Sequence, residues 1–181
     1  MALISCYLPP QKKNDMENIK IRISNETDFE RIFEIWLENQ SQAIGKHADS
    51  TDIEGFRQDL SRLFFKTPRC FFYVAELESR QIIGWQGLLP LLSNPIIGKY
   101  TAQSSTYIDK TFVNRDVGSR LVEHAVNDAR RLGIEHIYGW VKADNAATNK
   151  ISENFNTHKF FIPSPNRGGL PDFNLYVVIV Q

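Results

Sequence analysis

The sequence is poor in cysteine and has no excess of charge of either sign. Its 181 residues include two cysteines, Cys6 and Cys70, which belong to no CxxC or Cys/His cluster, so neither a disulfide framework nor a metal site is expected. The 21 basic and 21 acidic residues give a formal net charge of zero, which offers no electrostatic reason to expect nucleic acid as a partner. No run of about 18 apolar residues occurs, so no membrane span is expected. A reduced, cytoplasmic location is the default expectation.

The composition is that of a globular domain. Hydrophobic residues make up 42% of the chain and charged residues 23%, and this length allows one domain with a sizeable core. Residues 1–18 lack the basic start and the cleavage site of a signal peptide, so we interpret them as a mobile leader. Residues 19–181 contain no repeat, low-complexity segment or linker, and a single domain is expected there.

Apolar periodicity predicts an alternation of strands and helices. Strands are expected at 19–23, 70–77, 81–91, 102–108, 135–141, 159–163 and 173–180. Helices are expected from a capping box of Thr27 and Glu30, over 52–65, up to about 132 before a stop at Gly133, and over 145–155. This order predicts one mixed α/β domain, with a parallel crossover between the strands 102–108 and 135–141.

Turn-forming residues run into a helical pattern at 113–119, just beyond the strand 102–108. Ligands of open α/β sheets bind beyond such strand ends, and the unpaired N–H groups of a helix start can hold a pyrophosphate. The residues that favour an anion here are a glycine, two arginines and a serine: Gly118, Arg115, Arg120 and Ser119. Asp116 opposes an anion unless it points outward as a helix cap. Taken alone, the segment favours an ordinary capped helix over an anion site.

The surrounding sequence resembles the GCN5-related N-acetyltransferases (GNAT), and within them the branch of the phosphinothricin and methionine sulfone acetyltransferases. "TYI" ends the strand, "VNRDVG" (113–118) occupies the place of the pyrophosphate loop, and "ADNAA" (143–147) is intact. "ISENFN" (151–156) falls on the end of the following helix. The resemblance covers roughly residues 19–181.

The resemblance implies a GNAT-type, strongly twisted mixed sheet of six to seven strands flanked by about four helices. It implies transfer of an acetyl group from acetyl-coenzyme A (acetyl-CoA) to the primary amine of a small amino-acid-like molecule, and a possible homodimer. The pantetheine arm would run between 102–108 and 135–141. The residues expected at the coenzyme are Ile108, Asp109, Val113, Asn114, Arg115, Asp116, Val117, Gly118, Ser119, Arg120 and Asn145. Asn145 could bridge the arm or simply cap a helix.

The chain departs from the family pattern at the positions that carry chemistry. Val113 and Asp116 stand where relatives have Gln or Arg and the first glycine of the loop. Gln103 stands at the position of the glutamate that serves as base, and Ser152 at that of the Tyr or His that protonates the leaving thiolate. A glutamine can orient a water but is not a useful proton acceptor. A backbone N–H near Tyr107 could still polarise the thioester carbonyl.

Two functions therefore stay open. The first is an N-acetyltransferase in which Gln103, Tyr107 and Ser152 surround the reacting atoms, and catalysis relies on proximity and on the strand amide. The second is a module that binds acyl-CoA or a partner without turnover. The sequence offers five replacement bases, each of which has a structural explanation as well: Tyr73, Tyr100, Tyr107, Glu38 and Asp109. The four histidines, His47, His124, His136 and His158, have neither triad nor metal spacing.

Overall fold

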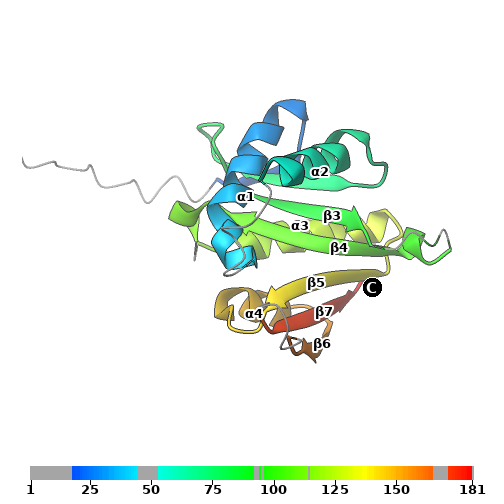
Figure 1. The fold of residues 1–181 in the computed structure, drawn as a ribbon. Helices are drawn as coiled ribbons and strands as arrows, with labels where there is room; N and C mark the ends of the chain where they lie inside the picture. Colours follow the sequence, from blue (N-terminus) through cyan, green and yellow to red (C-terminus); the bar gives the residue numbers. More distant parts are fainter. Residues whose placement is uncertain are drawn as a thin grey trace, which may run out of the picture.

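The computed structural model describes residues 18–44, 53–91, 94, 96–113, 115–164 and 171–180. The expected leader, apart from Asn18, lies outside the described residues. Within them, seven strands form one sheet in the order β1-β2-β3-β4-β5-β7-β6 (Figure 1). The strands are β1 (Lys20–Ile23), β2 (Phe71–Glu76), β3 (Ile82–Pro90), β4 (Thr101–Ile108), β5 (His136–Lys142), β6 (Thr157–Ile162) and β7 (Phe173–Ile179).

Four α-helices flank this sheet in the described part of the chain. They are α1 (Phe29–Ile44), α2 (Ile53–Lys66), α3 (Val117–Arg131) and α4 (Ala146–Glu153). The expected mixed α/β domain, its element order and the parallel pairing of β4 with β5 are confirmed. None of the helices in the described residues has the length and apolar character needed to cross a bilayer.

Of the two helix ends predicted from the sequence, the stop at Gly133 is confirmed and the capping box at Thr27 is not. Gly133 follows α3 with φ +70°, the left-handed conformation that a C-terminal glycine adopts at low cost. The capping box at Thr27 and Glu30 is wrong, because the cap is Asn25. Its side chain accepts from the Thr27 N–H at 2.9 Å, and its own N–H donates to Asp28 at 2.7 Å. A 3₁₀ turn over Glu26–Asp28 therefore precedes α1.

Two apolar layers lie on opposite faces of the sheet. α1 and α2 cover one face, where Trp36 and Leu60 pack with Trp85 of β3. α3 covers the other, where its buried stripe packs against Ala102 of β4 and Leu88 of β3 (Figure 1). Because strand residues alternate between faces, β4 presents Ala102, Ser104, Thr106 and Ile108 to the α3 side. It presents Gln103, Ser105 and Tyr107 to the α1 side.

The far end of the sheet is covered on one face only in the described residues. Asn149 of α4 accepts hydrogen bonds from Asn174 at 3.0 Å and from Tyr176 at 2.6 Å, both on β7. These residues place α4 on the α3 side. On the other side, aromatic and aliphatic side chains of β5 and β6 are exposed: Trp140, Phe160 and Ile162 at 49%, 53% and 36%.

Candidate active site at the divergence of β4 and β5

The pairing between strands β4 and β5 ends halfway along β4. Their parallel pairing runs from Thr101 opposite His136 to Ser104 opposite Gly139. Beyond it, β4 remains paired with β3 as far as Ile108, and β5 remains paired with β7. The two strands diverge toward the left of Figure 1, on the side where α4 lies. The resulting gap in the β4–β5 pairing lies where the resemblance implies the pantetheine arm.

The end of β4 is fixed by contacts with α1. Asp109, buried at 6% exposure, follows β4 and accepts from the backbone and hydroxyl of Thr111 at 2.9 and 2.7 Å. Its other carboxylate oxygen pairs with the Arg31 guanidinium. Asn39 of α1 donates its side-chain amide to the Ile108 carbonyl at 2.9 Å. The Asp109 side chain is therefore held by the fold, and the Ile108 side chain packs into the core below α3.

The expected pyrophosphate loop follows a 3₁₀ turn over Lys110–Phe112. Val113 is exposed, and the Arg115 guanidinium lies over the Phe112 ring, 5.3 Å from its centroid. A cation above a ring face is held weakly at an exposed site, so Arg115 can leave the ring at low cost. Asn114 lies outside the described residues.

Asp116 occupies the first position of the α3 start in an uncommon backbone conformation. Its φ of 61° and ψ of 7° are left-handed, and its side chain makes no capping hydrogen bond. A left-handed φ is unfavourable for residues with a Cβ, although Asp tolerates it better than most. The glycine that the resembled family has at this position would adopt this left-handed conformation without a Cβ penalty. The sequence left open that the Asp116 side chain caps α3. The structure contains no such hydrogen bond.

Gly118 has a packing role at the start of α3. A Cβ there would lie 3.1 Å from the Ile151 side chain of α4 and 4.0 Å from Ile108. Val117, at 1% exposure, is part of the α3 core layer. The glycine therefore lets α4 approach α3 at the open end of the two diverging strands.

The next two residues have different environments. Ser119 is partly buried in the first turn of α3. Arg120, expected to supply charge to an anion, instead donates its guanidinium to the Ile19 carbonyl at 2.6 Å. Since Ile19 precedes β1, this contact ties α3 to the first strand. Arg115 is therefore the better placed of the two arginines for a bound anion.

Asn145 precedes α4, and Ser152 lies near its C-terminal end. The Asn145 side-chain oxygen accepts from the Thr148 N–H at 3.1 Å, which is the helix-capping alternative stated from the sequence. This contact uses the carbonyl oxygen of the amide, and the NH₂ group is the part that could meet a ligand. Ser152 lies in the last turn of α4, and its side chain is outside what the structure describes.

The two strand residues expected near the reacting atoms lie on the α1 face of β4. Gln103 is partly buried and stands opposite Leu89 on β3 and Tyr138 on β5. Tyr107 lies with its ring 4.8 Å from that of Trp85. Burial raises the pKa of the Tyr107 hydroxyl, although the hydrogen bond with Trp36 opposes this. Tyr107 is thus protonated at neutral pH and is not a general base.

The other proposed bases are also engaged. Glu38 pairs with Arg31 at 3.2 Å, and Asp109 pairs with the same arginine. Tyr73, in the α3 core layer, donates its hydroxyl to Asp128, and burial raises its pKa. Tyr100 lies at the opposite end of β4, where the Lys99 ammonium stands 4.6 Å from its ring centroid. The structure thus supplies no obvious replacement base among these described residues.

The described residues include one cysteine, Cys70, and no cluster of metal ligands. Burial raises the pKa of the Cys70 thiol to about 11, so this cysteine is a weak nucleophile at neutral pH. No group of three or more His, Cys, Asp or Glu side chains with metal-binding geometry occurs in the described ranges.

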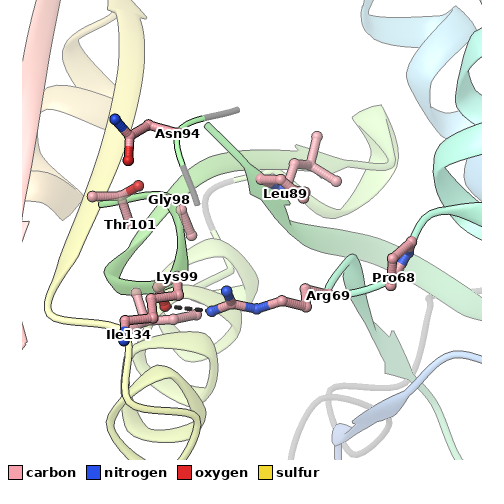
Figure 2. Close-up of a pocket in the computed structure, with 10 residues that line it drawn as sticks. Pro68, Arg69, Leu89, Asn94, Gly98, Lys99, Thr101 and Ile134 are labelled. Carbon is pink, nitrogen blue, oxygen red and sulfur yellow. Dashed lines mark hydrogen bonds between the residues drawn. The ribbon is translucent and has the colours of Figure 1, made fainter. Parts of the chain in front are cut away.

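A cavity of about 190 Å³ opens at the other end of β4, away from the loop. Thr101, Leu89 and Ile134 contribute to its wall, and Figure 2 shows the Arg69 guanidinium reaching across it to the Lys99 carbonyl. Arg69 itself has a φ of 63°. Because the expected pyrophosphate loop lies beyond the opposite end of the strand, we do not assign this cavity to the candidate site.

Sequence reasoning missed two polar residues that shape the site, Asn39 and Gln86. Asn39 sits on the sheet-facing side of α1, and Gln86 is 1% exposed in the middle of β3. A polar residue inside an otherwise apolar stripe was the available signal for both.

Comparison with known proteins agrees with this geometry. The sequence profile of the acetyltransferase (GNAT) family matches residues 29–154, more than half of the chain. This protein therefore belongs to the acetyltransferase (GNAT) family. Over 81 residues it is 32% identical to YwnH of Bacillus subtilis (strain 168), provisionally named a phosphinothricin acetyltransferase. The match covers 45% of this chain and 49% of YwnH, so the chain spans about half the length of that curated relative.

Two solved structures extend the likeness over the whole domain. A provisionally assigned phosphinothricin N-acetyltransferase aligns with a TM-score of 0.75 at 21% identity, covering 91% of this chain and 99% of its own. YncA from Salmonella typhimurium, provisionally described as an acetyltransferase and solved with its cofactor acetyl-CoA, aligns with a TM-score of 0.72 at 18% identity. That match covers 91% of this chain and 95% of YncA. At such identities the likeness establishes the fold.

Proposed function

We propose that this protein transfers an acetyl group from acetyl-CoA to the primary amine of a small amino-acid-like molecule. Membership of an acetyltransferase family supports the reaction class. The acetyl-CoA of the YncA structure supports the donor, and the names of YwnH and of one solved neighbour favour an amino-acid-like acceptor. The observation that carries the proposal is the end of the β4–β5 pairing at Ser104 and Gly139, one residue beyond Gln103.

The residues at the α3 start fit a coenzyme pyrophosphate. Helix N–H groups at this end are unpaired within the helix and carry partial positive charge. Gly118 lets α4 pack close beside this helix end, and Arg115 can add a cation. Asp116 opposes the anion by charge, since its carboxylate is exposed at the same helix end. We therefore expect binding in the micromolar range.

The chemistry requires one bond to form and one to break. The neutral amine nitrogen attacks the thioester carbonyl carbon, a C–N bond forms, the C–S bond breaks, and coenzyme A leaves as its thiolate. A backbone N–H near Tyr107 or Ile108 would polarise the carbonyl. The proton released by the amine passes to water, which Gln103 can orient without itself accepting a proton.

The alternative function is a module that binds acyl-CoA or a partner without turnover. Three substitutions together favour this alternative: Gln103 in place of the base, Ser152 in place of the acid and Asp116 in place of the loop glycine. A thermal melt with acetyl-CoA tests the shared step, since a ligand at a hundredfold excess over its Kd adds about 2.7 kcal/mol to native stability. Thiol release across a panel of amino acids and amines tests turnover. A melt unchanged by millimolar acetyl-CoA would overturn both the transferase and the binding of the coenzyme, whereas binding without thiol release would favour the module.

Two further expectations from the sequence remain proposals. One is a location in the reducing cytoplasm. The other is a homodimer formed through the exposed face of β5, β7 and β6, where Trp140 and Phe160 lie on either side of Leu175.

A further inference from the structure

A buried glutamine lies beside the point where β4 leaves β5. Gln86, on the α3 face of β3, makes three hydrogen bonds through its side chain. Its Nε2 donates to the Ser104 hydroxyl at 2.7 Å and to the Gly87 carbonyl at 3.2 Å. Its Oε1 accepts from the Thr106 hydroxyl. A buried amide is tolerated in an otherwise apolar layer only when its hydrogen bonds are satisfied. Packing alone would favour an apolar residue here, so we ask what the three hydrogen-bonded side chains do.

The chemistry of the groups fixes the direction of these hydrogen bonds. An amide nitrogen only donates, so the Ser104 oxygen must act as the acceptor from Gln86. The Thr106 proton is used on the Gln86 oxygen. The hydroxyl proton of Ser104 is consequently left to donate elsewhere, and no acceptor for it is found among the described residues.

Space for such an acceptor lies on the β5 side of Ser104. Its partner across the last rung of the ladder is Gly139. A Cβ on Gly139 would meet no heavy atom within 4 Å. Ser104 is also partly exposed, although β4 is a central strand with α3 over this face. Both observations indicate an opening beside the hydroxyl, on the α3 side of the diverging strands.

We propose that Ser104 donates its hydroxyl proton to a carbonyl oxygen of the pantetheine arm of acyl-CoA, and that Gln86 and Thr106 orient it for this contact. The inference rests on the proposed function, because it assumes that acyl-CoA lies between β4 and β5. It assigns a binding role to Ser104 and a positioning role to Gln86.

The test compares two ligands on one protein. Acetyl-CoA contains the pantetheine arm, whereas 3′,5′-ADP lacks the arm and keeps the adenosine, the 3′-phosphate and one phosphate of the pyrophosphate that the α3 start would hold. By isothermal titration calorimetry, Ser104→Ala should weaken acetyl-CoA about tenfold, the usual size of one lost hydrogen bond, and leave 3′,5′-ADP unchanged. Ser104→Thr keeps the hydroxyl and should retain most of the affinity. Ser105→Ala, which alters the neighbouring residue on the other face of β4, is the matched control.

A second variant tests the orientation by Gln86. In Gln86→Glu the carboxylate can only accept, so Ser104 must donate to it and its proton is withdrawn from the ligand. We expect the same loss of acetyl-CoA affinity as in Ser104→Ala, with unchanged 3′,5′-ADP binding and no further loss in the double variant. Because the buried carboxylate could prevent folding, Gln86→Met serves as the second variant, and it should give a smaller loss of acetyl-CoA affinity alone.

Different outcomes test the proposed function and the roles of Ser104 and Gln86. If the wild-type protein binds neither ligand, the proposed function fails. If the wild-type protein binds both, an acetyl-CoA affinity that Ser104→Ala leaves unchanged, or lowers together with that for 3′,5′-ADP, overturns the role of Ser104. If Gln86→Glu and Gln86→Met leave acetyl-CoA affinity intact, the positioning role of Gln86 is overturned.

Discussion

The side-chain amide of Asn39 in α1 donates a hydrogen bond to the carbonyl of Ile108, the last residue of β4, at 2.9 Å. The second hydrogen of the same amide meets the Ile35 carbonyl at 2.8 Å. Asn39 is 8% exposed, so both contacts are shielded from water. The pair locks α1 to the end of β4, whose backbone N–H groups are the ones proposed to polarise the thioester.

Replacement of Asn39 should therefore cost both stability and turnover. Asn39→Leu leaves the Ile108 carbonyl without its partner and should lower the free energy of unfolding by about 2 kcal/mol. Asn39→Asp should cost more at neutral pH, because its carboxylate would face two carbonyl oxygens. Urea unfolding measures both, with the exposed Asn127→Asp in α3 as control. Equal stability of Asn39→Asp and the wild type would contradict this account.

Asp116→Gly should stabilise the protein and tighten coenzyme binding. Glycine adopts the left-handed backbone of this position without a Cβ penalty, which is worth about 0.5–1 kcal/mol. It also removes a negative charge from the helix start that would hold the pyrophosphate. Thermal melts with and without acetyl-CoA measure both effects.

Asp116→Asn separates the two causes, since it removes the charge but keeps a side chain that tolerates the left-handed region. It should tighten acetyl-CoA binding without the full gain in stability. Weaker binding in Asp116→Gly would show that the aspartate contributes to the loop in a way that its missing cap contact does not explain.

The regular elements were predictable because their signals are local. The buried stripe of α3 recurs every four residues and ends at Gly133, and the hairpin of β2 and β3 encloses a short polar turn. The start of α1 was misassigned because both Asn25 and Thr27 are good capping residues. Only the extended backbone of Asn25, with φ −124° and ψ 174°, decides between them.

The contacts of the polar residues in the site were not predictable, because their partners are distant in sequence. Asn39 contacts a residue 69 positions away, and Gln86 one 18 positions away. A sequence pattern assigns polar residues to the surface unless the strand register is known. Likewise, Arg120 looked suited to an anion, and only the packing of β1 beside α3 reveals its contact with the Ile19 carbonyl.

Acid should weaken the fold through Arg22, which bridges two carboxylates at 2.7 Å (Asp28) and 3.0 Å (Glu76). The hydrogen bond from Arg22 lowers the pKa of Glu76 below its ordinary 4.5. Burial raises the pKa of Asp28, but hydrogen bonds from Arg22 and Asn25 outweigh it and the pKa lies below 3.8. The unfolded chain then binds more protons in acid, so this stability is present above these ordinary values and is lost as pH falls through the lowered ones.

Arg22→Met is the corresponding variant. It leaves two largely buried carboxylates without a cation and should cost about 3 kcal/mol at pH 7. The cost should shrink at pH 4, because protonation removes the unpaired charges. Urea unfolding at both pH values measures the difference, and an equal cost at both would contradict the ion-pair origin.

The exposed face of β5, β7 and β6 should form the homodimer contact. Phe160→Lys places a charge in the middle of this face and should convert a dimer at micromolar concentration to a monomer, as measured by light scattering. Phe161→Lys is the matched control, because Phe161 is as exposed, at 59%, but lies on the opposite face of β6. A wild-type protein that is monomeric at that concentration would remove the basis for this assembly.

Gln103→Glu should turn a slow enzyme into a faster one. Gln103 stands where the resembled relatives carry their base, next to the last rung of the β4–β5 ladder. A positioned carboxylate is worth roughly 10²–10⁴ in rate, so thiol release on amino-acid-like amines should rise by that factor. Gln103→Ala should cost about tenfold or less, or 1.4 kcal/mol in the barrier, because glutamine accepts no proton.

The pH profile shows whether the new carboxylate acts as the base. Its ionised form is the proton acceptor, so the activity of Gln103→Glu should rise with pH through the carboxylate's pKa, level off, and be lost as pH falls through that pKa. Calorimetry with acetyl-CoA is the control, since the substitution should leave donor binding unchanged. A Gln103→Glu variant that binds acetyl-CoA yet releases no thiol across the amine panel would mean that the acceptor site is absent too. The binding-module function would then account better for the chain than the transferase does.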